Sequence, residues 1–148
     1  MDLSRKWLAE FVDSPADDKE YCDAMTLSGS KVEGVTVEGT EIRNVVVGRV
    51  LAMERHPDSD HMWTCQVDAG RGAPLQIVTG AQNVNVGDLV PVALHDSWLP
   101  GGVHITAGTL RGVESNGMLC SYKELGMTDH DWPYSVADGI FILTSDPD

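Results

Sequence analysis

The feature that most constrains this chain is a change of hydrophobic pattern at about Thr40. Beyond this residue, short apolar or alternating runs follow one another, separated by glycine, proline and other turn residues. Such spacing is typical of all-β barrels and sandwiches. We therefore expect a mainly β domain over residues 40–148, preceded by a segment of different character over residues 1–39.

Five runs carry the strand pattern, and a sixth lies near the end of the chain. They cover residues 43–54, 62–68, 75–79, 89–94, 117–121 and 139–143. Five core strands suit a partly closed Greek-key barrel, which is the architecture of the OB fold. Gly48 stands in the middle of the first run, and a glycine or bulge is what allows a strand to bend in a small barrel.

The first 39 residues predict two short helices and a strand. Residues 4–12 place Trp7 and Phe11 on one side at helical spacing, with Ser4 as the N-cap. Ser14 followed by Pro15 predicts the cap and first position of a second helix, which ends at Gly29. A strand is then expected at three valines: Val32, Val35 and Val37. This piece is too small to bury both of its faces, so we interpret it as an incomplete α+β segment.

The charge of the chain is strongly acidic, with 10 basic against 23 acidic residues and a formal net charge of −13. Residues 40–148 hold six of the basic and fourteen of the acidic residues, a balance of −8. Nucleic-acid binders usually carry the opposite sign. Any contact with RNA is therefore expected to be weak.

The sequence contains no run of roughly 20 apolar residues that would cross a membrane, and no secretory leader pattern. Its three cysteines, Cys22, Cys65 and Cys120, are far apart and form no C-x-x-C pair. We expect a cytoplasmic chain whose cysteines are reduced, buried thiols.

Two imidazoles and two carboxylates lie within six residues, at His56, Asp58, Asp60 and His61. Such a cluster could hold zinc, and metal-dependent hydrolysis is the alternative that it raises. The simpler interpretation is a polar turn between two strands, shaped by Pro57. No phosphate-binding loop or dinucleotide fingerprint is present, so no nucleotide site and no catalytic residue is predicted.

The segment from Arg111 to Ser121 is the best functional candidate. Ser115, Asn116 and Ser121 flank a Gly117-Met118 turn, and Arg111 supplies a fixed charge that can pair with phosphate. The alternative is that the segment simply enters the last strand of the barrel. For Arg111, Ser115 and Asn116, both interpretations stay open.

Several blocks of sequence occur together in one order. They are VVVGRV at 45–50, HPDSD at 56–60, LQIVTGAQN at 75–83, GDLVPVAL at 87–94, LPGG at 99–102 and GVESNGMLCS at 112–121. Upstream lie LSRKWL at 3–8 and GSKVEG at 29–34. The whole pattern resembles the N-terminal region of the bacterial phenylalanine tRNA synthetase beta subunit, including its EMAP-type tRNA-binding OB domain.

This resemblance implies a division of the chain and a set of partners. Residues 1–39 would be the N-terminal part of a split α+β domain, and residues 40–148 an OB-fold tRNA-binding domain. The implied parent assembly joins phenylalanine to tRNA with ATP and magnesium. Its active site lies in the alpha subunit and its editing site in a later part of beta, so this fragment would not be catalytic and would hold no cofactor.

The implied partners are tRNA, the alpha subunit and the rest of the beta subunit. The RNA-binding residues expected from the resemblance and the polar pattern are Arg49, Arg111, Ser115, Asn116 and Ser121, with no metal. RNA-binding relatives tend to carry lysine at the position of His61 and basic residues at 106–109, which again predicts weak binding. The alternative function is an OB module that docks protein within the synthetase and does not itself bind tRNA.

Overall fold

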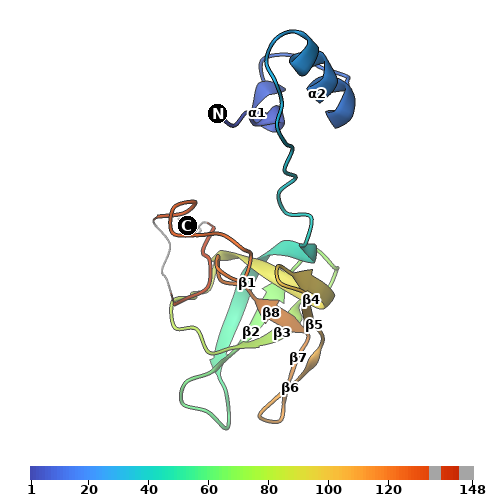
Figure 1. The fold of residues 1–148 in the computed structure, drawn as a ribbon. Helices are drawn as coiled ribbons and strands as arrows, with labels where there is room; N and C mark the ends of the chain where they lie inside the picture. Colours follow the sequence, from blue (N-terminus) through green and yellow to red (C-terminus); the bar gives the residue numbers. More distant parts are fainter. Residues whose placement is uncertain (134–137, 144–148) are drawn as a thin grey trace. The chain divides into compact units, whose positions relative to one another are not determined.

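The computed structural model describes residues 1–133 and 138–143 (Figure 1). The chain divides into two compact units, residues 1–38 and 39–148. The boundary expected from the sequence, between residues 39 and 40, lies next to this division.

The first unit contains two helices, α1 (Arg5–Leu8) and α2 (Asp18–Leu27). Ser4 caps α1 as expected, but this helix ends at Leu8 and does not continue to Val12. The cap expected at Ser14 was wrong, because Asp17 is the N-cap of α2. There the Asp17 carboxylate accepts a hydrogen bond from the backbone N–H of Glu20 at 2.8 Å, and the Glu20 side chain accepts one from the backbone N–H of Asp17. This reciprocal capping satisfies two donors at once, which a serine before a proline does not.

The strand expected at Val32, Val35 and Val37 is absent from the structure, where residues 31–37 have no strand pairing. A strand requires a partner for its backbone groups, and the described part of this unit offers only helices. No residue of either helix is buried. The large apolar side chains remain open, with Trp7 60% and Phe11 69% exposed.

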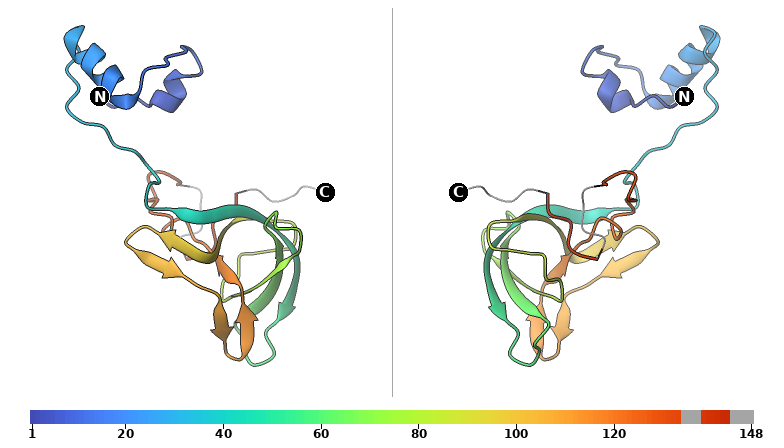
Figure 2. Two further views of the ribbon diagram at one scale, coloured as in Figure 1. Left: turned by 90° about the vertical axis from the view of Figure 1, so that its right-hand side faces the viewer. Right: turned by 90° about the vertical axis from the view of Figure 1, so that its left-hand side faces the viewer.

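The second unit is a nearly closed antiparallel barrel (Figure 2). Its strands are β1 (Arg43–Arg55), β2 (Trp63–Asp68), β3 (Leu75–Thr79), β4 (Leu89–Leu99), β5 (Val103–Ile105), β6 (Gly108–Leu110), β7 (Val113–Ser115) and β8 (Gly117–Leu119). The main sheet has the order β3-β2-β1-β4-β5, and β8 also pairs with β4. Because β7 and β8 contact β3, the sheet curls back on itself. The expected mainly β, OB-like fold with two preceding helices is confirmed.

The core of the barrel consists of side chains that alternate inward from four strands. Val50, Val67, Ile77, Val90 and Val92 are all at most 1% exposed. Gly48 belongs to this packing, because a Cβ there would lie 2.6 Å from Val92 Cγ2 and 2.7 Å from Val67 Cγ1. The register of β1 against β2 shifts between Val50 and Ala52, so a bulge accompanies the bend that the sequence predicted.

The structure differs from the sequence-based strands at the end of the chain. Residues 139–143 are not a strand, although Ile140 and Phe141 are buried. The side chain of Asn83 holds this segment, donating to the Ile140 carbonyl at 2.9 Å and accepting from the Ile140 N–H at 3.0 Å. The Phe141 and Leu143 N–H groups then donate to Cys120 and Leu89 carbonyls. The segment therefore packs on the barrel through single hydrogen bonds and not through a regular ladder.

Within residues 1–133 and 138–143, no helix is both long enough and apolar enough to span a bilayer.

Candidate nucleic-acid interface

Two hairpin tips lie side by side at one end of the barrel (Figures 1 and 2). One is the loop of residues 56–62 between β1 and β2, and the other is the turn between β6 and β7. His56 joins them, since its Nε2 lies 3.0 Å from the Leu110 carbonyl oxygen. We call the surface formed by these two tips the hairpin end.

Arg111 and Gly112 form the two-residue turn between β6 and β7, because Leu110 and Val113 on either side pair with each other. Both turn residues have positive φ, 48° for Arg111 and 81° for Gly112. A two-residue hairpin with positive φ at both positions is the type I′ class, which matches the natural twist of the strands. Arg111 is exposed at this tip, where a large ligand can reach its guanidinium.

A second arginine, which the sequence analysis did not select, lies at the base of the 56–62 loop. The Arg55 guanidinium lies 4.2 Å from the centre of the Trp63 ring, and its Nη1 donates to the Asp60 carbonyl at 2.6 Å. Trp63 in turn donates through Nε1 to Gln82 Oε1 at 3.3 Å. A guanidinium stacked on an indole keeps its outer N–H groups for phosphate.

Ser115 is not a surface residue, which argues against the direct RNA contact expected of it. It is 4% exposed, and its hydroxyl accepts from the Val78 N–H at 3.0 Å and donates to the Gly117 carbonyl at 2.9 Å. This hydroxyl fastens β7 to β3. Asn116 beside it is half-buried, and its backbone N–H donates to the Gln76 carbonyl at 2.8 Å. The side chain of Asn116 has no hydrogen-bond partner among the described residues, so it stays a candidate.

Arg49 and Ser121 lie away from the hairpin end. Arg49 pairs across the sheet with Asp68 and Leu89, six residues along β1 from Arg55, which corresponds to roughly 20 Å of strand. Ser121 follows β8, where its hydroxyl and its backbone N–H both donate to the Glu124 carboxylate, at 2.8 and 2.6 Å. The structure therefore does not bring the five expected residues to one surface.

The His56–His61 cluster has the geometry of a turn. His56 is 3% exposed, and both of its ring nitrogens have protein partners, the Leu110 carbonyl and the Asp58 N–H. His61 is exposed. In the part of the chain that the structure describes, no three His, Cys, Asp or Glu side chains are placed to hold a metal ion.

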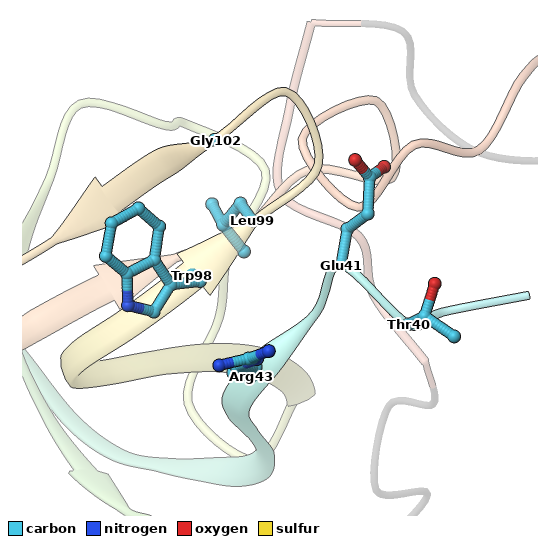
Figure 3. Close-up of a pocket in the computed structure, with 6 residues that line it drawn as sticks. All are labelled: Thr40, Glu41, Arg43, Trp98, Leu99 and Gly102. Atoms are coloured by element: carbon cyan, nitrogen blue, oxygen red, sulfur yellow. The ribbon is translucent and has the colours of Figure 1, made fainter.

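A shallow hollow of about 410 Å³ lies on another part of the barrel (Figure 3). Its lining includes Trp98, whose ring stacks on His104 at a centroid distance of 4.3 Å, together with Arg43 and Glu41. The opposite charges of Arg43 and Glu41 offset each other there. The hollow therefore lacks the net positive charge that a phosphate site requires.

Cys65 and Cys120 are buried inside the barrel. Burial raises the pKa of the Cys65 thiol to about 11, and burial together with the nearby Glu124 carboxylate raises the pKa of Cys120 to about 12. Both groups are therefore neutral thiols at physiological pH, which fits the expected structural role and provides no nucleophile.

Comparison with known proteins places the barrel in a family. Residues 45–138 match the family described as "Putative tRNA binding domain". The chain belongs to this family. The matched residues cover most of the barrel, including both tips of the hairpin end.

The similarity extends upstream of the family match. The chain is 53% identical over 88% of its length to the phenylalanine–tRNA ligase beta subunit of Clostridium acetobutylicum, and 49% identical over 99% to that of Clostridium tetani. It is 42% identical over 99% to the beta subunit of Bacillus subtilis. The chain spans only 16–18% of the length of these relatives. The resemblance to the N-terminal region of this subunit, expected from the sequence blocks, is confirmed.

Among solved structures, the crystal structure of the C-terminal domain of Plasmodium vivax p43 is similar at 26% identity and a TM-score of 0.44, covering 54% of this chain and 46% of that one. This likeness is too partial to add to the assignment.

For a member of a tRNA binding family, the hairpin end has a mixed charge. Arg55 and Arg111 are the cations next to the two tips, while Asp58, Asp60 and Glu114 are acidic residues in or beside them. No lysine lies in either tip. A phosphate would therefore find two local positive positions within a surface that repels it at longer range.

Proposed function

We propose that the hairpin end of the barrel binds tRNA, and that the two arginines next to its tips make the phosphate contacts. The observation that carries this proposal is the hydrogen bond between His56 and Leu110, which holds the tips of two separate hairpins together. Arg55 and Arg111 each adjoin one residue of that pair. In OB folds, the loops after the first and fourth barrel strands commonly bind oligonucleotides. The 56–62 loop and the β6–β7 hairpin occupy these two places in the topology.

The side chain of Asn116 is the remaining polar group of the expected set that is free to contribute. An amide can donate to phosphate or ribose oxygens without carrying charge. Arg49 and Ser121 lie elsewhere on the barrel and are not part of this surface. The proposed contact set at the hairpin end is therefore Arg55 and Arg111, and Asn116 is a separate candidate at the other end of β7 from the Arg111 turn.

Binding by this chain alone should be weak and independent of sequence. The barrel region has a balance of −8, so long-range attraction to a polyanion is missing. Two phosphate contacts supply only a small counterion-release term. We expect a dissociation constant of about 10–100 µM at physiological salt, within the range of non-specific binding.

We further propose that the chain serves as an accessory part of a phenylalanine–tRNA ligase, in complex with an alpha subunit and the remainder of a beta subunit. The similarity to beta subunits over nearly the whole chain supports this. The first unit would then be the N-terminal part of a split α+β domain, whose exposed Trp7 and Phe11 become covered by the later part of the subunit. ATP and magnesium would act at the alpha subunit, and this chain would not be catalytic.

A salt titration with tRNA tests the main proposal. Labelled tRNA is titrated with the full chain at several salt concentrations, and fluorescence anisotropy reports the binding. Arg111→Ala should weaken binding to all tRNAs alike and reduce the slope of log K against log salt by about one, as one lost phosphate contact does.

Arg71→Ala is the matched control. Arg71 is also an exposed arginine in a glycine-flanked turn, but it lies between β2 and β3, at the far end of β2 from the 56–62 loop. Arg71→Ala deletes the same charge and should leave the slope of log K against log salt unchanged. If the two variants behave alike, or if the wild-type chain does not bind, the alternative of a protein-docking module replaces the RNA surface.

A further inference from the structure

At the hairpin end, the His56 side chain forms hydrogen bonds through both of its ring nitrogens. Its Nδ1 accepts a hydrogen bond from the Asp58 backbone N–H at 3.1 Å, and its Nε2 faces the Leu110 carbonyl at 3.0 Å. The ring is 3% exposed. One imidazole therefore connects its own loop to a hairpin that is 54 residues away in the sequence.

These two partners fix the protonation state of the ring. A backbone N–H can only donate, so Nδ1 must be the unprotonated nitrogen. A carbonyl oxygen can only accept, so Nε2 must carry the hydrogen. His56 is therefore neutral and protonated at Nε2, because an imidazolium would turn a second N–H toward the N–H of Asp58.

The β6–β7 hairpin needs such a connection. Among the described strands, β6 pairs only with β7, and a two-stranded hairpin alone is marginally stable in water. At the β7 end, Ser115 bonds to Val78, and the Gln76 side chain donates to the Glu114 carbonyl at 2.8 Å. Leu110 is the residue of β6 directly before the Arg111 turn. Its carbonyl oxygen is the hydrogen-bond partner of His56.

We infer that His56 is the positioning residue of the RNA surface, holding the Arg111 turn beside the 56–62 loop while making no contact with RNA itself. This inference rests on the proposed function, because it assigns a role within the same surface. It adds a specific mechanism: the affinity for RNA depends on a buried neutral imidazole that sets the distance between two cations.

The experiment uses the full chain and three variants. His56→Ala removes both hydrogen bonds, whereas His56→Gln keeps a donor and an acceptor at the end of the side chain. His130→Gln is the control, because His130 is exposed and lies outside the hairpin end. For each protein, ¹⁵N relaxation reports the order of the Gly112 and Val113 amides, and anisotropy reports tRNA binding. In the wild type, long-range ¹H–¹⁵N spectra report the tautomer of His56.

We expect the Nε2–H tautomer in the wild type. His56→Ala should make the turn amides mobile and weaken tRNA binding about fivefold, the usual effect of losing one hydrogen bond, here the bond to Leu110 that joins the two tips. His56→Gln should restore much of both properties, and His130→Gln should change neither. The wild-type spectra test the inference even if His56→Ala does not fold.

Three results would overturn the inference. They are an Nδ1–H or charged His56 in the wild type, turn amides that stay ordered in His56→Ala, and mobile turn amides with unchanged tRNA affinity. The last result leaves the proposed function intact, because binding persists with its salt dependence. A wild-type chain with an ordered turn and no tRNA binding instead refutes the proposed function, and the role of His56 in RNA binding with it.

Discussion

Replacing Gly48 by alanine should destabilise the barrel more than its small size suggests. The added Cβ would lie 2.6 Å from Val92 Cγ2 and 2.7 Å from Val67 Cγ1, whereas carbon atoms in favourable contact are about 3.5–4.0 Å apart. Both valines are fully buried, and they belong to the strands on either side of β1. Relief therefore requires β2 and β4 to move outward by roughly 1 Å.

Overpacking of this kind costs about 3 kcal/mol at its upper range, and burial of one more methyl group returns about 0.8 kcal/mol. The expected loss is about 2 kcal/mol, which lowers the melting temperature of a domain of this size by about 10 °C. Thermal and urea unfolding followed by circular dichroism would measure both quantities. Gly80→Ala is the control, since a Cβ there meets nothing within 4 Å and its φ is not positive.

A double variant tests whether the contact with Val92 causes the loss of stability in Gly48→Ala. Val92→Ala removes the nearer clashing methyl group, so combining it with Gly48→Ala should destabilise the protein less than the sum of the two single changes. If Gly48→Ala unfolds at the same temperature as Gly80→Ala, the close packing of β1 between β2 and β4 is not what requires glycine.

Four further predictions concern other parts of the chain. Asn83→Ala should lower the free energy of unfolding in urea by about 1–3 kcal/mol, because two hydrogen bonds to the C-terminal segment are lost. Asn85→Ala is the control and should change it little, since the Asn85 side chain makes no hydrogen bond among the described residues. At pH 8, iodoacetamide should modify Cys22 before the buried Cys65 and Cys120, as read by mass spectrometry. The free energy of unfolding should fall as pH rises above 9.0, because the unfolded thiols ionise there while the folded ones stay neutral until about 11 and 12. A chain that begins at residue 40 should melt cooperatively with a β-type spectrum, and failure to fold would show that the helices belong to the same core.

The sequence predicted the parts of the fold that follow from local pattern. The strands at residues 75–79 and the starts of β1 and β4 appear where the apolar runs place them. β5, β6 and β7 were missed because each is three residues long, too short for alternation to register. The cap of α2 was misplaced although Asp17 and Glu20 carry the capping-box spacing, since the Ser-Pro pair upstream offered a competing signal.

The candidate site was less predictable, because its geometry depends on long-range contacts. Ser115 resembles a surface hydroxyl in sequence, and only the approach of β3 shows that it is buried. Arg55 and Trp63 meet because they are partners in the β1–β2 register, which no spacing rule identified. The hydrogen-bonded residues His56 and Leu110 are 54 positions apart in the sequence. Arg111 is exposed at the tip of a short turn, a position for which the sequence left two interpretations open.

The backbone of Arg111 has a consequence for how this surface is maintained. A side chain other than glycine, asparagine or aspartate in the left-handed region costs about 1–2 kcal/mol, and asparagine followed by glycine is the preferred pair for this turn. An Arg111→Asn chain would therefore gain folding stability while losing a cation at the tip. Selection for stability alone would favour asparagine at this turn, so an arginine there carries a stability cost that its charge at the tip must offset.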